Sequence, residues 1–276
     1  MSNSFTHLSI SSGYSFKYGS AHPEQLIERA AQFNMTSLAL TDQNNLAGAI
    51  RFAQSCESFG IKPILGITLP FIQKSSKITL LAKSGSLSAL YRLVSGINTN
   101  TSDGVLTIEL LERFNQYSKN LIALLGPQSV LNKNLTNRKE AAALSNYQLI
   151  KELFDTVAIE CVSHLERSGN LRSTTAAGRS LAFAIKHQIP AVITNQVRML
   201  EKSDGPVIDV LDANRKLSFI GSATVERSNG EAYLKDSASM AYLADQIARA
   251  AASLRLVRFL LRDDCGPSSA IRSFEY

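Results

Sequence analysis

Tryptophan is absent from this 276-residue chain, and cysteine is scarce, with only Cys56, Cys161 and Cys265 and no C-x-x-C pair. Disulfide-dependent secreted proteins carry more cysteines, so the composition favours a reduced, cytoplasmic chain. No uninterrupted apolar run approaches the about 20 residues that span a bilayer, and the N-terminal residues do not place a basic region before an apolar one. The sequence therefore predicts neither a membrane segment nor an export signal.

Short motifs of nucleotide-binding and hydrolytic enzymes are also missing. No two of the 15 glycines stand two positions apart, which excludes G-x-G-x-x-G. The patterns G-x-x-x-x-G-K-[ST], H-E-x-x-H and G-x-S-x-G do not occur either. The four histidines, at positions 7, 22, 164 and 187, are too dispersed in the sequence to form a local metal-binding motif.

The chain has instead the composition of an ordinary globular protein, with 45% hydrophobic and 19% charged residues. The 29 Lys and Arg residues against 23 Asp and Glu give a net charge of +6. Because this excess is small and spread along the chain, it predicts at most weak contact with DNA, without sequence preference.

Short β-branched runs alternate with longer amphipathic stretches, a pattern typical of β-α units and a parallel sheet. The predicted strands are 5–11, 36–40, 63–69, 78–82, 121–125, 156–162 and 190–194. The predicted helices are one beginning at Pro23, then 46–59, 87–97, 106–114, 147–154, 174–187, 207–214 and 237–261. The polar stretch 128–146 is interpreted as a surface excursion or insertion.

The last predicted helix carries Arg249, Arg255, Arg258 and Arg262 beside its apolar positions. Two interpretations stay open. It is either a packed terminal helix with a solvated basic face, or a helix that binds a partner or nucleic acid.

In parallel β/α folds, functional residues gather at the carboxyl ends of the strands. The residues predicted there are Ser9, Ser11, Asp42, Gln43, Thr68, His164, Asn195, Gln196 and Arg198. This set is polar but has few carboxylates and imidazoles. Neutral hydroxyls and amides cannot balance the charge of two or three divalent cations, so a multinuclear metal site is not expected.

Several runs resemble one known family. FTHLSISSGYS and the segment from HPEQLIERAAQF to GIKPILGITL are similar to the start of the PHP (polymerase and histidinol phosphatase) domain at the N-terminus of bacterial DNA polymerase III alpha subunits. The same order continues in the runs LIALLGP, VAIECVSH, IPAVITNQVR and PVIDVLDANRKL. Among the types of alpha subunit, the sequence most resembles the error-prone type. The resemblance covers residues 5–245 and implies an α/β fold, a distorted (β/α)7 barrel with a metal cleft.

Active members of that family carry His-x-His on the first strand, and the matching positions here are Ser9 and Ser11. An aspartate precedes the next glycine in such members, whereas Tyr18 precedes Gly19 here. The Thr-Asp-His motif after the second strand ends in Gln43.

The later ligand positions differ in the same way. Thr68 replaces an acidic residue, and the family's Asn-Asp-x-His reads Asn195, Gln196, Val197, Arg198. Of the ligands that the resemblance implies, Asp42 and, by a looser match, His164 remain.

This loss predicts a relic site without metal or other cofactor, because Arg198 would place a fixed positive charge where a cation should sit. The alternative is a rearranged shell that binds one metal in a divalent-metal-dependent phosphoesterase. Asp42 is either a relic ligand or a cap of the following helix, and a salt bridge from Arg198 to Asp42 would replace the metal's charge. Ser9 and Ser11 have no identifiable base and acid for nucleophilic catalysis.

We therefore expect a noncatalytic PHP barrel over residues 1–236 and a helical extension over 237–276. The resemblance implies a structural or interaction module in replication or repair synthesis, with a polymerase core or other replication or repair proteins as partners. The polymerase carboxylates are absent, so this chain alone is expected to be inactive. Its end at Tyr276 fits a split gene, a remnant or a fragment, and a free-standing adaptor is a further alternative.

Overall fold

The structure is a computed structural model that describes residues 5–222 and 228–254. The chain divides into two compact units. Unit 1 consists of Met1–Ile67 and Asn195–Met240, and unit 2 consists of Thr68–Thr194 and Ala241–Tyr276. Most positions of the predicted site fall in unit 1, whereas Thr68 and His164 fall in unit 2.

Unit 1 contains α1 (Pro23–Gln32), β1 (Ser37–Leu40), α2 (Ala49–Phe59), the first part of β2 (Lys62–Phe71), the 3-10 helix η1 (Lys202–Asp204) and α9 (Gly205–Arg215). β1 runs parallel to β2, in register from Ser37 opposite Lys62. Pro23 occupies the first turn of α1, and Gly60 ends α2 in the left-handed conformation at φ 66°. The apolar faces of both helices enter one core with β1, which includes Leu26, Leu38 and Phe52.

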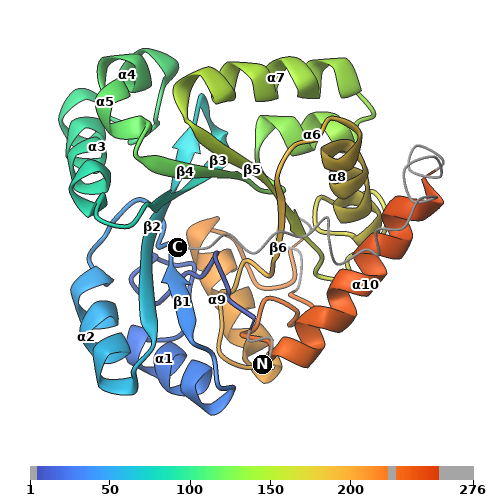
Figure 1. The fold of residues 1–276 in the computed structure, drawn as a ribbon. Coiled ribbons are helices and arrows are strands. Elements are labelled where there is room, and N and C mark those ends of the chain that lie inside the picture. Colours follow the sequence, from blue (N-terminus) through green and yellow to red (C-terminus); the bar gives the residue numbers. More distant parts are fainter. Residues whose placement is uncertain (1–4, 223–227, 255–276) are drawn as a thin grey trace. The chain divides into compact units, whose positions relative to one another are not determined.

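Unit 2 contains β3 (Gln73–Ala82), α3 (Leu87–Asn100), α4 (Ile108–Arg113), α5 (Asn115–Ser118), β4 (Leu121–Leu125), α6 (Val130–Thr136), α7 (Glu140–Leu153), β5 (Thr156–Val162), α8 (Thr174–Lys186) and β6 (Ala191–Thr194). Figure 1 shows the strands and helices of the chain. All five residues of β4 are buried, as are the four of β6. Such continuous apolar runs are typical of strands covered on both faces.

The prediction of an all-parallel sheet is wrong at β3. β4, β5 and β6 are parallel neighbours, but β3 is antiparallel to β4. Only Ile72 separates β2 from β3, and its φ is 65°. A parallel neighbour needs a crossover of a dozen or more residues, so this one-residue connection reverses the chain direction.

Two further predictions need correction. The run 5–11 forms an isolated parallel bridge, Ile10 to Val197, so the described residues contain six named strands and not seven. The stretch 128–146 is not a surface excursion, because it contains α6 and the start of α7, with Leu131 and Leu135 buried. The Ser129 side chain caps α6 by accepting a hydrogen bond from the Asn132 N–H.

The C-terminal helix is confirmed as α10 (Ser237–Ser253), while the expected continuation to 261, with Arg255 and Arg258, lies outside the described residues. In unit 2, a Cβ atom on Gly178 of α8 would meet the Cβ of Ala250 at 2.7 Å, so α10 packs closely on α8. Arg249 forms an exposed ion pair with Asp245 at 2.9 Å.

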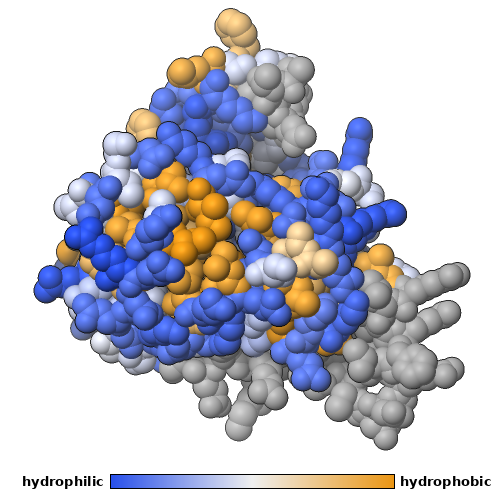
Figure 2. All heavy atoms as spheres, turned by 90° about the horizontal axis from the view of Figure 1, so that it is seen from above, coloured by the Kyte–Doolittle hydropathy of each residue, from blue (hydrophilic) through white to orange (hydrophobic). Residues whose placement is uncertain are grey.

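No helix within residues 5–222 and 228–254 has the length and apolar character needed to cross a membrane. On the face shown in Figure 2, hydrophobic side chains gather in one area that hydrophilic side chains surround.

Candidate functional site

Asp42 follows β1 and is the carboxylate around which the predicted site in unit 1 is built. It is 1% exposed and accepts hydrogen bonds from the Ser12 N–H at 2.7 Å, the Ser12 hydroxyl at 2.8 Å and the Ser15 hydroxyl at 2.6 Å. Both carboxylate oxygens therefore have donors from the chain itself.

Burial raises the pKa of Asp42, and the hydrogen bonds from Ser15 and Ser12 only partly oppose this effect. Since α2 begins at Ala49 with Gly48 as its N-terminal cap, the interpretation of Asp42 as a helix cap is wrong. Its carboxylate instead fixes the loop that carries Ser12 and Ser15.

Ser9 and Ser11 lie beside the segment that follows β6. The Ser11 N–H donates to the Val197 carbonyl at 2.8 Å, and the Val197 N–H donates to the Ser9 carbonyl at 2.9 Å. These bonds bring the first and last parts of the predicted site together through the backbone. Gln43 joins the same network, because its N–H donates to the Ser15 hydroxyl at 2.9 Å.

Arg198 has a bidentate partner that the sequence did not reveal. Its Nη2 lies 2.7 Å from Asp212 Oδ1, and its Nη1 lies 3.1 Å from Asp212 Oδ2. Nη2 and Nε also donate to the Tyr18 carbonyl at 3.2 and 3.3 Å. The guanidinium carbon stands 3.9 Å from the centre of the Tyr18 ring, within the range of a cation–π interaction. The hypothesis of an Arg198–Asp42 salt bridge is therefore wrong.

Asp212 lies on α9 and also contacts Arg215 at 2.7 Å. Burial raises its pKa, but hydrogen bonds and charges from Arg198 and Arg215 outweigh burial, so the pKa is lowered overall. Asp212 is consequently ionised at neutral pH, and its charge compensates the arginine at a position where the family resemblance implied a metal ligand.

Thr68 and His164 belong to unit 2. The Thr68 hydroxyl lies 3.0 Å from the Thr79 hydroxyl, and the His164 N–H donates to the Arg172 carbonyl at 2.8 Å. Gln196 is in unit 1 and has a positive φ of 42°. Backbone or side-chain hydrogen bonds within unit 1 thus involve Ser9, Ser11, Tyr18, Asp42, Gln43 and Arg198.

Sequence reasoning missed Ser12, Ser15 and Asp212. Ser12 and Ser15 stand next to the matched family positions, and their hydroxyls were the available signal. Asp212 is far from Tyr18 in sequence and belongs to no short motif, so only the fold reveals its role.

The donors at these positions do not fit a divalent cation. Ser9, Ser11 and Gln43 are neutral, the Asp42 oxygens already accept bonds from serines, and the Arg198 guanidinium, paired with Asp212, has no acceptor atom to offer a metal. Across residues 5–222 and 228–254, no three His, Cys, Asp or Glu side chains gather as potential metal ligands.

Comparison with known proteins identifies the class. The model of the PHP domain family matches residues 7–164, more than half of the chain, so this chain belongs to the PHP domain family. The predicted α/β fold class, with a PHP-type fold, is confirmed.

Two of the similar curated proteins are bacterial DNA polymerases. DNA polymerase III subunit alpha of Buchnera aphidicola subsp. Acyrthosiphon pisum is 30% identical over 259 residues, covering 89% of this chain and 22% of that protein. The error-prone DNA polymerase of Symbiobacterium thermophilum is 30% identical over 259 residues, covering 84% of this chain and 23% of that protein. The chain is thus homologous to polymerase III alpha and error-prone polymerases, and it spans about a fifth of their length.

Among solved structures, a two-domain protein of Bacteroides vulgatus that contains a predicted PHP-like metal-dependent phosphoesterase matches with a TM-score of 0.46. Its sequence is 10% identical, and the match covers 78% of this chain and 56% of that chain.

Proposed function

We propose that this chain is a noncatalytic PHP domain that serves as a structural or interaction module of a DNA polymerase III alpha-like protein. The observation that carries the proposal is the Arg198–Asp212 pair stacked on Tyr18. It fills two positions matched to metal ligands with a guanidinium and an aromatic ring. The homology to polymerase III alpha subunits supports the role in replication or repair synthesis.

Metal analysis tests the noncatalytic part. The purified chain is dialysed against Mn2+, Zn2+ or Fe2+, passed through a desalting column and analysed for metal and for hydrolysis of a phosphate ester. We expect metal far below one ion per chain and no metal-dependent turnover. The Asp42→Asn variant is the matched control, because metal retained equally by both proteins is not held by Asp42. One ion per wild-type chain that is lost in this variant would support the phosphoesterase alternative.

An exposed apolar surface in unit 1 supports the interaction role. It comprises Val207 and Val210 on α9 and the residues after it, Leu217, Phe219 and Ile220, and we call it the α9 surface. Leu217 is 89% exposed and Phe219 is 87% exposed. Five large apolar side chains are thus exposed within residues 207–220, and exposed apolar groups that lie close together mark contact sites for partners more often than isolated ones do.

The polymerase core is the partner that the homology suggests. A DNA polymerase III alpha subunit without its PHP region, from the organism that supplies this chain, would be mixed with the purified chain and examined by size-exclusion chromatography. We expect a complex that the Leu217→Ser/Phe219→Ser variant weakens about tenfold or more, since buried aromatic anchors dominate interface energies. Phe16→Ser is the control, because Phe16 is 80% exposed but lies outside the α9 surface. Absence of a complex at micromolar concentrations would contradict the assembly role.

Direct DNA contact is proposed to be weak. The net charge of +6 supports a nonspecific electrostatic interaction, whose affinity falls steeply as salt is added. Filter binding with duplex and single-stranded oligonucleotides should show this salt dependence and no sequence preference. Tight binding that persists at high salt would contradict it.

The division into a domain over 1–236 and an extension over 237–276 also remains a proposal. Its support is local, because α10 begins at Ser237 and the Asp236 carboxylate accepts a hydrogen bond from the Ser239 N–H at 2.8 Å. Limited proteolysis that cleaves first beside residue 236 would support this boundary, whereas first cleavage inside the segment 5–222 would contradict it.

A further inference from the structure

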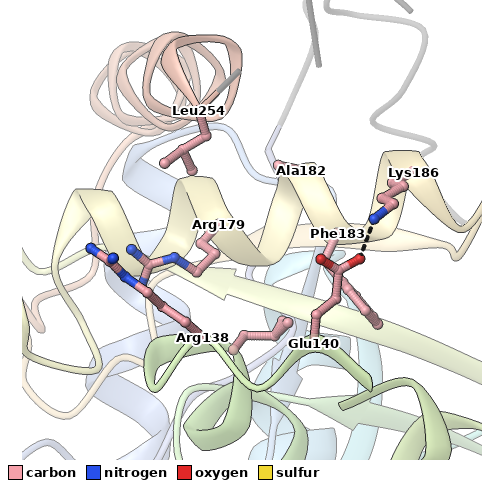
Figure 3. Close-up of a pocket in the computed structure, with 8 residues that line it drawn as sticks. Arg138, Glu140, Arg179, Ala182, Phe183, Lys186 and Leu254 are labelled. Atoms are coloured by element: carbon pink, nitrogen blue, oxygen red, sulfur yellow. Dashed lines mark hydrogen bonds and ion pairs between the residues drawn. The ribbon is translucent and has the colours of Figure 1, made fainter. Parts of the chain in front are cut away.

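Unit 2 contains a pocket of about 270 Å3 that is separate from the positions discussed above. It lies against the end of α6, the start of α7, α8 and the residue after α10, and Figure 3 shows its lining. The residues that line it are Leu135, Arg138, Glu140, Arg179, Ala182, Phe183, Lys186 and Leu254.

Two arginines give one side of this pocket its charge. Figure 3 shows the guanidinium groups of Arg138 and Arg179 on the same side, away from the Glu140–Lys186 pair. Arg179 donates to the Thr136 carbonyl at 3.3 Å, a neutral acceptor that leaves its charge uncompensated. Within the part of the chain that the structure describes, no carboxylate pairs with either guanidinium. The arginines are therefore available to an anionic ligand.

Glu140 does not neutralise them, because its charge is engaged elsewhere. Its Oε1 lies 2.5 Å from Lys186 Nζ and 3.0 Å from His187 Nε2. Hydrogen bonds from Lys186 and His187 lower the pKa of Glu140, so it remains an ionised partner of these two side chains. The two ends of the pocket thus differ in charge.

The rest of the lining is apolar. Leu135 and Phe183 are 3% and 4% exposed, and Ala182 and Leu254 complete the wall. Phe183 packs against His187 with ring centres 4.5 Å apart, so it is not an open platform for stacking a nucleobase. The volume lies just below the usual range for small-molecule sites, so the pocket suits side chains of a bound segment better than a drug-sized molecule.

We infer that this pocket binds an acidic peptide segment of a partner protein, with a carboxylate on Arg138 and Arg179 and a neighbouring aliphatic side chain against Leu135, Phe183 and Leu254. Arginine guanidinium groups bind carboxylates in a bidentate geometry. An apolar cavity beside them adds affinity for a peptide that places a leucine-sized group there. This inference does not depend on the proposed function, because it uses different residues in a different unit.

Fluorescence anisotropy tests it with a labelled, end-capped octapeptide of alternating glutamate and leucine. We expect saturable binding to the wild-type chain. An octapeptide of alternating glutamate and serine, which lacks the aliphatic group, should bind at least about tenfold more weakly. An octapeptide of alternating lysine and leucine should not bind. The affinity should fall with added salt, as expected for ion pairs near the surface.

Variants locate the binding. Arg138→Gln should weaken the glutamate–leucine peptide on the order of tenfold, because a hydrogen bond to a charged group is lost. Arg138→Gln/Arg179→Gln should remove measurable binding. Arg92→Gln, which removes an exposed arginine from α3, is the matched control and should bind as the wild type does. Arg138 is itself exposed, so its single variant keeps the test valid if the double variant does not fold.

Three results would each overturn the inference. The first is no saturable binding of the glutamate–leucine peptide up to about 1 mM. The second is equal loss in Arg92→Gln and Arg138→Gln, which would mean attraction to net charge alone. The third is displacement of the peptide by a single-stranded oligonucleotide in preference to unlabelled peptide, which would identify a nucleic-acid site.

Discussion

The guanidinium of Arg198 packs on the ring of Tyr18, with its carbon 3.9 Å from the ring centre, and its Nη2 donates to the Asp212 carboxylate at 2.7 Å. Both side chains of the ion pair are largely buried, at 13% and 16% exposure. A buried arginine keeps its charge, so the fold must supply a compensating carboxylate. This pair balances the charge of Arg198 inside unit 1, at a position that the family resemblance matches to a metal ligand.

Replacing Asp212 with asparagine should destabilise the chain by about 3 kcal/mol, because the Arg198 charge would stay buried without its partner. Urea denaturation at pH 7 measures the change. Glu201→Gln is the matched control, since it removes the partner of Arg29 in a more exposed ion pair and should cost much less. Equal losses in both variants would show that the Arg198 pair has no special role.

The same pair makes stability depend on acid. The pKa of Asp212 is lowered in the folded chain, so its contribution is complete above the unfolded value of about 4 and is lost as the pH falls further. The difference in unfolding free energy between wild type and Asp212→Asn should therefore narrow below about pH 4. A difference that stays constant from pH 7 to the acid limit would contradict this assignment.

Asp42 should show the opposite pH dependence. Burial raises its pKa in the folded chain, so the folded state loses stability as the pH rises from the unfolded value of about 4 through the raised folded value. Relative to the Asp42→Asn variant, the wild type should therefore become less stable over that interval. Denaturation curves of the two proteins across pH 4 to 7 measure it, and parallel curves would count against a raised pKa.

Much of the fold could be predicted because the spacing of apolar residues and the residues that start or end a helix are local features of the sequence. The strand Leu121–Leu125 and the helix that begins at Pro23 follow directly from an apolar run and an N-terminal proline. The reversal at Ile72 could not, since a β-branched residue with φ 65° carries no turn signal. The stretch 128–146 was misjudged because its polar residues hid the Ser129 cap and the buried pair Leu131 and Leu135.

The site was predictable only in part for a related reason. The resemblance placed Ser9, Ser11 and Arg198 at family positions, and the backbone bonds to Val197 connect the first two with the last segment. What each side chain would contact depends on the tertiary fold. Arg198 pairs with Asp212 on α9 and not with Asp42. The Asp42 oxygens instead accept hydrogen bonds from Ser12 and Ser15.

His7 predicts a second acid dependence. It is fully buried, its Nε2 lies 2.8 Å from the Lys235 carbonyl, and its Nδ1 has no hydrogen-bond partner among the residues that the structure describes. Burial is the main cause that lowers the pKa of His7 to about 4. The hydrogen bond to the Lys235 carbonyl raises this pKa, whereas the nearby Lys235 charge lowers it. Neutral His7 is therefore the form that the fold accommodates.

The contribution of His7 should be complete above the unfolded pKa of about 6.5 and should fall by about 3 kcal/mol as the pH drops to 4. His7→Gln keeps a donor for the Lys235 carbonyl and should lack this part of the pH dependence. The His22→Gln variant retains His7 and should follow the wild-type curve. A wild-type pH profile that His7→Gln reproduces would contradict the assignment.

Gly19 should tolerate no side chain, because the loop from Ser11 to Gly19 that carries the Asp42 contacts closes on itself there. A Cβ atom at Gly19 would lie 2.5 Å from the Ser11 carbonyl oxygen and closer still to that of Ser12, so the backbone would have to move. We expect Gly19→Ala to cost about 3 kcal/mol in urea denaturation, as overpacking against backbone atoms does. Gly13→Ala is the matched control in the same loop, because the nearest atom to its added Cβ would be the Ala21 carbonyl oxygen at 3.6 Å. If Gly19→Ala were as stable as Gly13→Ala, the loop would not be held as tightly as the Asp42 hydrogen bonds require.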